Sequence, residues 1–417
     1  MTAEGRAYDT EGVQRRTVAT LVGSQALGGI GVSTGIAVTA LLAEDILGSP
    51  DLAGLAQTAQ VLGAAAASYA IARFSAARGR RYGLATGYGV GAIGAVLCLV
   101  AGVAESFALL LIGATMLGSA TAANSQARFA ATDLADAAHR ARALSIVVWA
   151  TTIGAVSGPN LVGPAGDLAE LFSLPRLTGA YLIGAAGIAL GVGFVAVRMR
   201  PDPLLLAREI ERSAEGHATN RRRRAIDAVR EHPQVIAGVV AIAAAHATMV
   251  SVMVMTPLHM GHGGSGLEVI GFVISVHILG MYAFSPLVGW LTDSIGPRQV
   301  LLAGSFLLFG AVALAGTAHE GWSLGLTVGL FLLGLGWSFA LVASSAIVTS
   351  AVPLADRPTV QGFSDMVMGV AAGGGGALAG VIVGMWGFAA LNVGAAAIVC
   401  VVVASALAVP RTDVHTG

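Results

Sequence analysis

The sequence predicts an all-α membrane protein whose twelve transmembrane helices form two halves of six. Three observations support this fold class. Of the 417 residues, 55% are hydrophobic and only 11% are charged, and the mean hydropathy is +0.78, which is outside the range of soluble domains. The apolar residues fall into about twelve runs, each near the roughly 20 residues that cross a bilayer. A long polar stretch separates the sixth run from the seventh.

The apolar runs give the expected helices in order. The first run follows a polar leader with Arg6, Arg15 and Arg16 and is long enough to span, so we expect a retained helix rather than a cleaved signal peptide. The expected spans are 18–43, 51–73, 82–103, 106–132, 142–166, 177–198, 234–258, 267–291, 298–318, 322–350, 358–383 and 386–408. This even number places both termini on the same side of the membrane.

The distribution of arginine predicts the orientation. The chain has no Lys, so all 23 of its basic residues are Arg. Arginines in the second loop, the fourth loop and the central polar stretch fall on one face, which the positive-inside rule makes cytoplasmic. Among the expected outer loops only Arg176 is basic, beside several Asp and Glu residues. We therefore expect a multi-pass protein of the cytoplasmic (inner) membrane with both termini in the cytoplasm.

The polar stretch divides the chain into three parts. Residues 1–198 form the N-terminal six-helix half, residues 199–233 a cytoplasmic linker, and residues 234–417 the C-terminal six-helix half. We expect part of the linker to form an amphipathic helix along the membrane face. The Arg221–Arg224 run is interpreted as a topology determinant, with an anionic-lipid patch as the alternative.

A loop motif gives this organisation a family resemblance. Between the eighth and ninth spans, GWLTDSIGPRQVLL resembles the loop motif of major facilitator transporters, whose two six-helix halves expose a midplane cavity to each side in turn. The resemblance places Gly289, Asp293, Gly296 and Arg298 in a cytoplasmic gate, where charge-assisted contacts form and break. The matching first-half segment, ARFSAARGRRYGL, lacks the acidic residue. We expect an asymmetric gate that is stronger in the second half.

The fourth and fifth expected helices carry residues that bear on whether transport is coupled to protons. Helix five carries GAVSGPNLVGP, which is similar to the glycine and proline motif of drug and proton antiporters in the same superfamily, with one extra residue before Gly163. In helix four, Ala114 stands where such antiporters have an intramembrane Arg. The remaining candidates for proton coupling are Asp365 in helix eleven and Asp133 at the end of helix four. A packing or capping role for Asp365 is an equal alternative.

Histidine and methionine cluster in the seventh and eighth spans. Met249 and Met253 are four residues apart, as are His277 and Met281, so each pair lies on one face of its helix. At about 1.5 Å of rise per residue, Met249 and His277 lie at a similar depth near the midplane. Three thioethers and one imidazole suit Cu(I), which they hold without requiring a deprotonated ligand. Packing is the simpler alternative for a methionine pair taken alone, as a satisfied polar group is for a lone histidine.

The same residues carry a more specific resemblance. MVSVM and HILGM resemble the paired motifs of CcoA-type copper importers, major facilitator proteins that supply copper for the assembly of cbb3-type cytochrome oxidase, and NSQARFAATD and VVWATTIGAVSGPN extend the resemblance. It implies that Met249, Met253, His277 and Met281 bind copper as cargo, with a cytoplasmic copper acceptor as a candidate partner. Four residues extend the cluster outward as candidate accessory ligands: His246, Met255, His259 and His262.

The sequence leaves alternatives open and excludes others. A proton-coupled drug exporter, or a carrier of an organic solute such as riboflavin, is the alternative to copper import. No nucleophile and base grouping, phosphate-binding motif or nucleic-acid footprint is evident, so we expect neither an enzyme nor a nucleic-acid partner. Cys98 and Cys400 lie in separate apolar runs, which excludes a CxxC motif. We expect a monomer in the lipid bilayer with no resident cofactor.

Overall fold

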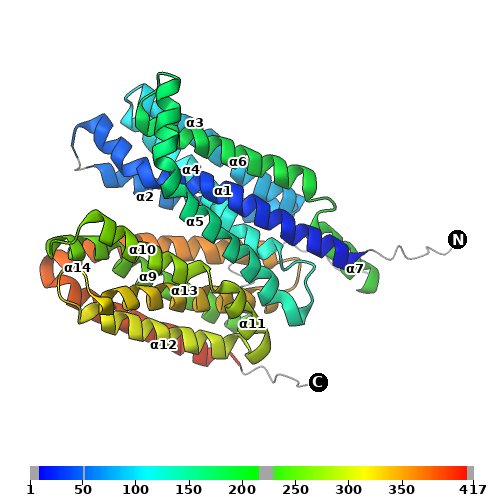
Figure 1. Ribbon diagram of the computed structural model, residues 1–417. Coiled ribbons are helices and arrows are strands. Elements are labelled where there is room, and N and C mark those ends of the chain that lie inside the picture. The colour runs from blue at the N-terminus through cyan, green and yellow to red at the C-terminus, as the bar shows by residue number, and fades with distance from the viewer. Residues whose placement is uncertain (1–8, 50–51, 216–228, 230, 411–417) are drawn as a thin grey trace.

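The structure is a computed structural model that describes residues 9–49, 52–215, 229 and 231–410. Within these residues all regular structure is helical, and the helices form two bundles lying side by side (Figure 1). The first bundle contains α1 (Thr10–Leu47), α2 (Ala53–Arg78), α3 (Arg80–Val103), α4 (Phe107–Ala130), α5 (Arg140–Leu171) and α6 (Gly179–Arg198). Two short 3-10 turns precede α5 and α6. The all-α class expected from the composition is confirmed.

The second bundle follows a linker helix, α7 (Pro203–Glu215). It contains α9 (Pro233–His262), α10 (Leu267–Tyr282), α11 (Ser285–Ile295), α12 (Pro297–Gly316), α13 (Leu324–Ser350) and α14 (Arg357–Ala408). The expected amphipathic linker helix corresponds to α7, whereas the Arg221–Arg224 run lies outside the described residues. The start of α1 and the end of α14 lie at the same end of the molecule (Figure 1).

Twelve membrane crossings result from these helices. Ten helical segments of the described chain are long and apolar enough to span a bilayer. The longest, α14, has 52 residues and is interrupted at Gly387, whose φ of 85° breaks the helix into two spans. α2 has 26 residues and is long enough to cross, although its Gln, Thr and Ser side chains make it less apolar than the others. α10 and α11 together form one span.

Small residues bring the helices of the first bundle close together. A Cβ atom added at Gly154 of α5 would lie 2.4 Å from the backbone carbon of Gly29 in α1. The Ser33 hydroxyl donates to the Gly154 carbonyl oxygen at 2.6 Å, which joins the same two helices. Close backbone contact of this kind stabilises membrane bundles, where the lipid is as apolar as the side chains. The glycine-rich segment of helix five therefore serves packing against α1.

Candidate substrate cavity

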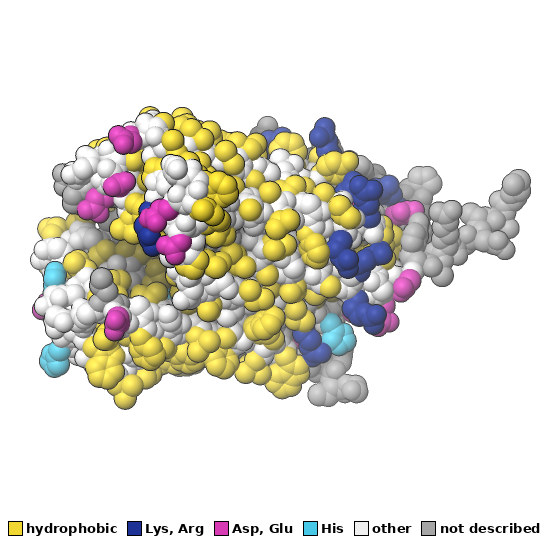
Figure 2. All heavy atoms as spheres, turned by 45° about the horizontal axis from the view of Figure 1, so that its top comes forward, with side chains coloured by type: hydrophobic (Ala, Val, Ile, Leu, Met, Phe, Trp, Pro, Cys, Tyr) yellow, Lys and Arg dark blue, Asp and Glu magenta, His cyan; other side chains and the backbone are white. Residues whose placement is uncertain are grey.

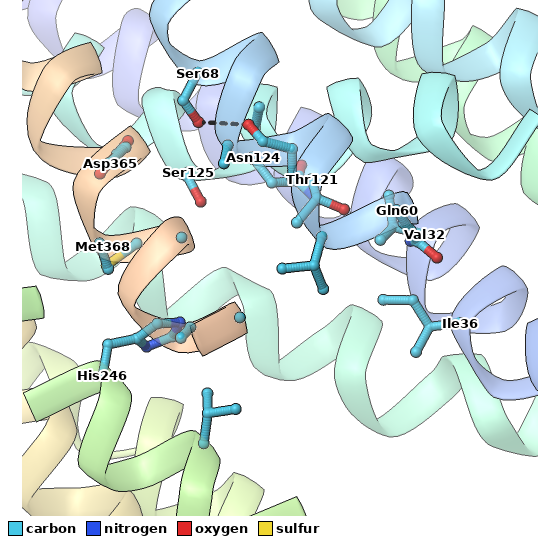
Figure 3. Close-up of a pocket in the computed structure, with 18 of the residues that line it drawn as sticks. Val32, Ile36, Gln60, Ser68, Thr121, Asn124, Ser125, His246, Asp365 and Met368 are labelled. Atoms are coloured by element: carbon cyan, nitrogen blue, oxygen red, sulfur yellow. Dashed lines mark hydrogen bonds between the residues drawn. The ribbon is translucent and has the colours of Figure 1, made fainter. Parts of the chain in front are cut away.

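A cavity of about 1060 Å³ lies between the two bundles. It is lined by α1, α2, α4 and α5 of the first bundle and by α9, α10, α13 and α14 of the second (Figure 3). Ligand pockets of this size usually hold small organic molecules. The volume is also far larger than a single metal ion needs.

The two sides of the cavity differ in chemistry. The first bundle contributes amide and hydroxyl side chains, among them Gln25, Gln57, Gln60, Thr121, Asn124 and Ser125. The second bundle contributes thioethers, aromatic rings and aliphatic groups, among them Val250, Met253, Met281, Tyr282, Trp337 and Met368. A solute that fills this space meets most of the hydrogen-bonding side chains on the first-bundle side and a more apolar surface on the second-bundle side.

One buried ion pair joins the bundles at the cavity. Arg128 of α4 donates to Asp365 of α14, and both side chains are almost fully buried. Arg128 also donates to the Ser345 hydroxyl at 3.2 Å, and Gln126 donates to the second carboxylate oxygen of Asp365 at 2.7 Å. These bonds satisfy both charges inside the protein, as buried ions require. Among the described lining residues, these are the one Arg and the one acidic side chain, so the pair leaves the cavity without net charge.

The cavity opens toward the end of the molecule that is poor in arginine (Figure 2). Gly54 and Gln57, at the start of α2, line its outer part, whereas Arg128 and Asp365 lie deeper. Figure 2 shows the surface hollowed between the bundles at one end, while most Arg side chains gather at the opposite end, with some Asp and Glu side chains among them. By the positive-inside rule the structure therefore faces outward.

Polar contacts between the bundles close the cytoplasmic end. The Asp293 carboxylate of α11 accepts from the backbone N–H groups of Ala141 and Arg142, each at 2.9 Å, at the start of α5. A carboxylate at a helix N-terminus is favoured by the unpaired N–H groups and the helix dipole. This contact places one of the gating residues expected from the sequence between the two halves.

A second contact involves the other coupling candidate, Asp133. Arg80 of α3 donates to Asp133 at 2.8 Å, and both side chains are fully buried. The same guanidinium donates to the side-chain oxygen of Gln361 in α14 at 2.6 Å. Arg80 thus links Asp133 of the first bundle to the second bundle.

The other expected gating residues shape the ends and the packing of the helices near the Asp293 contact. A Cβ atom at Gly289 would lie 2.1 Å from the Ser145 hydroxyl oxygen, so glycine allows α11 to approach α5. Gly296 has a φ of 93°, in the left-handed region, and ends α11. Arg298 donates to the carbonyl oxygen of Val409 at 3.1 Å, at the end of α14.

His246 presents a defined hydrogen-bond donor to the cavity. The Trp337 indole N–H donates to His246 Nδ1 at 2.6 Å, and the ring of His246 lies at the cavity (Figure 3). Because indole can only donate, Nδ1 must be an acceptor, which assigns the neutral tautomer with its proton on Nε2. Tyr282 packs edge-on against the same Trp337 ring at 5.7 Å. His246 is thus a donor beside an aromatic surface.

The four expected copper ligands do not all lie on the cavity. Met253 of α9 and Met281 of α10 line it, whereas Met249 is buried in the core of the second bundle. His277 is fully buried, and its Nδ1 contacts the Leu330 carbonyl oxygen in α13 at 2.8 Å. Since a carbonyl accepts, Nδ1 carries the proton and Nε2 has a free lone pair, which has no hydrogen-bond partner.

The accessory candidates are more dispersed. His259 stacks on Phe388 at 4.2 Å, and its Nε2 contacts the His319 carbonyl oxygen at 3.1 Å, so its ring is held in place. His262 is exposed at the end of α9, and Met255 packs against the core. Within the described residues, no three His, Cys, Asp or Glu side chains gather as a metal-binding group. A metal site at the expected position would therefore depend on methionine thioethers as ligands.

Comparison with known proteins identifies the family. The family model described as Major Facilitator Superfamily matches residues 21–276 and 237–416. The chain belongs to the Major Facilitator Superfamily. It is a multi-pass secondary transporter and not an enzyme, as expected from the sequence.

Several members of the superfamily resemble the chain over most of its length. It is 37% identical to the uncharacterized transporter YdeG and 36% identical to the uncharacterized transporter YddS, both from Bacillus subtilis. These alignments cover 91% and 92% of the chain and 88% of each relative. It is also 30% identical to the riboflavin transporter RfnT of Brucella anthropi, over 85% of both chains.

Solved structures of the superfamily share the fold. The human organic anion transporter MFSD10 matches with a TM-score of 0.75 at 16% identity, covering 94% of this chain and 99% of that one. The proton:xylose symporter XylE matches with a TM-score of 0.72 at 13% identity, covering 95% of both. At these identities the likeness concerns the fold alone.

Sequence reasoning missed the pairing of Arg128 with Asp365 and of His246 with Trp337. Arg128 and Asp365 are intramembrane charges, which are costly unless paired, and this signal was present in the sequence. Their mutual pairing was not, because nothing in the residue spacing links α4 to α14. The role of His246 likewise depends on Trp337, 91 residues further along the chain.

Proposed function

We propose that this transporter carries an uncharged organic solute of the flavin class, with a planar ring system and a polar, hydrogen-bonding edge. The observation that supports this most is the neutral cavity with two unlike walls. Its only charged side chains among the described lining residues, Arg128 and Asp365, bind each other. A charged cargo would have to be desolvated beside them without a counter-charge, which is unfavourable in a low-dielectric site.

The walls suit a flat heterocycle. The aromatic and thioether side can hold a ring face, since planar rings stack on aromatic side chains and methionine adapts to irregular apolar surfaces. The amide and hydroxyl side, which includes Gln25 and Asn124, can pair with ring carbonyls, ring N–H groups and hydroxyls. His246 Nε2–H adds a donor for a carbonyl oxygen. The relationship to RfnT, named as a riboflavin transporter, supports the same class.

Alternating access would move the solute inward from the outward-facing state. The cytoplasmic contacts of Asp293 and Arg80 with the opposite bundle would have to break as the halves rock. Asp365 would be the group that responds to protons, because protonation removes its charge from the pair with Arg128. In this account the cytoplasmic membrane is the site of action.

Riboflavin binding to the purified transporter tests the proposal. Titration should quench flavin fluorescence with saturation, and His246→Phe, which keeps a ring but removes the donor, should weaken binding by roughly tenfold, the worth of a lost hydrogen bond in a dry site. Cys400→Ala changes an exposed residue of α14 and is the matched control. Absence of saturable binding by the unchanged protein would contradict the proposal.

Copper import into the cytoplasm, supplying oxidase assembly, is the second candidate, and one observation favours it. The bond from His277 Nδ1 to a backbone carbonyl fixes Nε2 as a lone-pair donor, the arrangement typical of metal-binding histidines. Met253 and Met281 supply thioethers on the neighbouring cavity surface. Copper accumulation in cells that express the transporter, compared with His277→Ala at equal abundance, tests this candidate. Equal accumulation in both would remove it.

A further inference from the structure

The linker helix α7 contacts both bundles at the cytoplasmic end. Asp202, just before α7, accepts from the Arg81 backbone N–H at 2.8 Å and from the Leu204 N–H at 3.1 Å, which ties the start of α7 to the start of α3. Leu204 packs in one cluster with Leu134 of the first bundle and Leu354 of the second. α7 is therefore placed across the boundary between the halves.

Arg208 of α7 bridges this boundary. One guanidinium nitrogen donates to the Ala76 carbonyl oxygen at 2.9 Å, in the last turn of α2. A second nitrogen donates to the Ala355 carbonyl oxygen at 3.3 Å, just before α14. Carbonyls at a helix C-terminus carry partial negative charge and favour a cation. A single side chain thus connects an element of each half.

Arg208 makes its contact with the first half at the position where the loop motif of that half lacks an acidic residue. The loop glycines Gly79 and Gly296 have matching backbones, with φ of 96° and 93°, and so are equivalent positions of the two halves. The residue three positions before Gly79 is Ala76, and the residue three positions before Gly296 is Asp293, so these two are equivalent positions as well. Asp293 holds the start of α5 in the opposite bundle. At Ala76 no carboxylate is available to hold the start of α14 in the same way.

We propose that Arg208 is a positioning residue of the transport cycle, which replaces the missing first-half carboxylate and holds the cytoplasmic end closed from the linker. Asp293 reaches the opposite bundle directly, whereas Ala76 reaches it through the guanidinium of Arg208. At least one of the two donated bonds must break when the cavity opens inward, because Ala76 and Ala355 then move apart. This role concerns the equilibrium between outward-facing and inward-facing states and does not depend on the identity of the solute.

A cysteine-accessibility experiment tests the role. In a protein with Cys98→Ala and Cys400→Ala, Ser125→Cys places one thiol on the cavity wall. Its rate of labelling by a membrane-impermeant maleimide is measured from the cytoplasmic side in inverted vesicles. Arg208→Ala should raise this rate by roughly tenfold, the worth of a charge-assisted hydrogen bond. Arg208→Lys should give a smaller rise than Arg208→Ala. The ammonium keeps the positive charge and can still donate to one carbonyl, but it cannot span both carbonyls as the planar guanidinium does.

Two further variants separate the proposal from a general loss of structure. Arg212→Ala, on the same helix at an exposed position, should leave the labelling rate unchanged. Adding Ala76→Asp to Arg208→Ala should lower the rate again, because the new carboxylate can hold the start of α14 as Asp293 holds α5. An unchanged rate in Arg208→Ala, or failure of Ala76→Asp to lower it in a folded double variant, would overturn the proposal.

Discussion

Arg128 and Asp365 lie 237 residues apart in the chain and form a buried ion pair that connects α4 to α14 at the cavity. The pair joins the two halves of the transporter at the inner part of the cavity. Its contacts with Gln126 and Ser345 come from both bundles as well. Any rocking of the halves has to rearrange this cluster.

Asp365→Asn should destabilise the protein and abolish transport. The substitution leaves the Arg128 guanidinium buried without its counter-charge, and breaking a buried pair in this way typically costs about 3–5 kcal/mol. Melting temperature in detergent and uptake at equal membrane abundance measure the two effects. The double variant Arg128→Gln with Asp365→Asn removes both charges and should recover most of the stability without recovering transport. Full uptake by Asp365→Asn would remove the pair from the mechanism.

Trp337→Phe should weaken solute binding while leaving the fold intact. The change keeps a ring beside Tyr282 but removes the N–H that fixes His246 Nδ1 as an acceptor. The imidazole can then turn or change tautomer, so the donor facing the cavity is no longer held. We expect a loss of affinity of several-fold, since the bond positions the donor rather than forming it. Riboflavin titration measures it, and an affinity equal to that of the unchanged protein would contradict the role of Trp337.

Gly154→Ala should impair folding or membrane abundance more than Gly163→Ala. The added Cβ at residue 154 would lie 2.4 Å from the Gly29 backbone, so α1 and α5 must move apart. At Gly163 no atom lies within 4 Å of the added carbon, so that change is the matched control. Thermal stability of the two purified variants gives the comparison. Equal stabilities would show that the α1 and α5 contact tolerates separation.

His277→Ala separates the two candidate solutes. His277 is buried against α13 and does not line the cavity, so riboflavin binding should change little. If copper is the cargo, the same variant should lose copper accumulation, because its Nε2 lone pair is the nitrogen donor of the expected site. Copper content of cells and flavin binding of purified protein are measured on the same variant. Loss of flavin binding with normal copper accumulation would contradict the separate placement of the two sites.

The sequence predicted the fold well because its signals are local. Run length gives the spans, and arginine distribution gives the orientation, without knowledge of which helices touch. Asp293 could be placed in a gate because a loop motif carries it. The role of Arg208 could not be predicted, because Ala76 and Ala355 contribute only backbone oxygens to its hydrogen bonds. Every residue has such an oxygen, so the sequence does not reveal these partners.

The expected metal site shows where depth alone is insufficient. Counting residues places Met249 and His277 at a similar level, but it does not fix the direction in which each side chain points from its helix. In the structure His277 points to α13, Met249 lies in the core, and Met253 and Met281 face the cavity. The direction depends on how α9 and α10 rotate against α13, which is set by packing between helices distant in the chain.

Uptake of riboflavin compared with its 5′-phosphate tests the central claim, that the cavity accepts an uncharged organic solute. The assay uses a bacterial strain that cannot make riboflavin and has no flavin transporter of its own. The neutral cavity predicts growth on low riboflavin with the transporter and none without it, and no competition by the phosphate, whose charge has no partner beside the Arg128 and Asp365 pair. Equal uptake of both compounds, or of neither, would contradict the account.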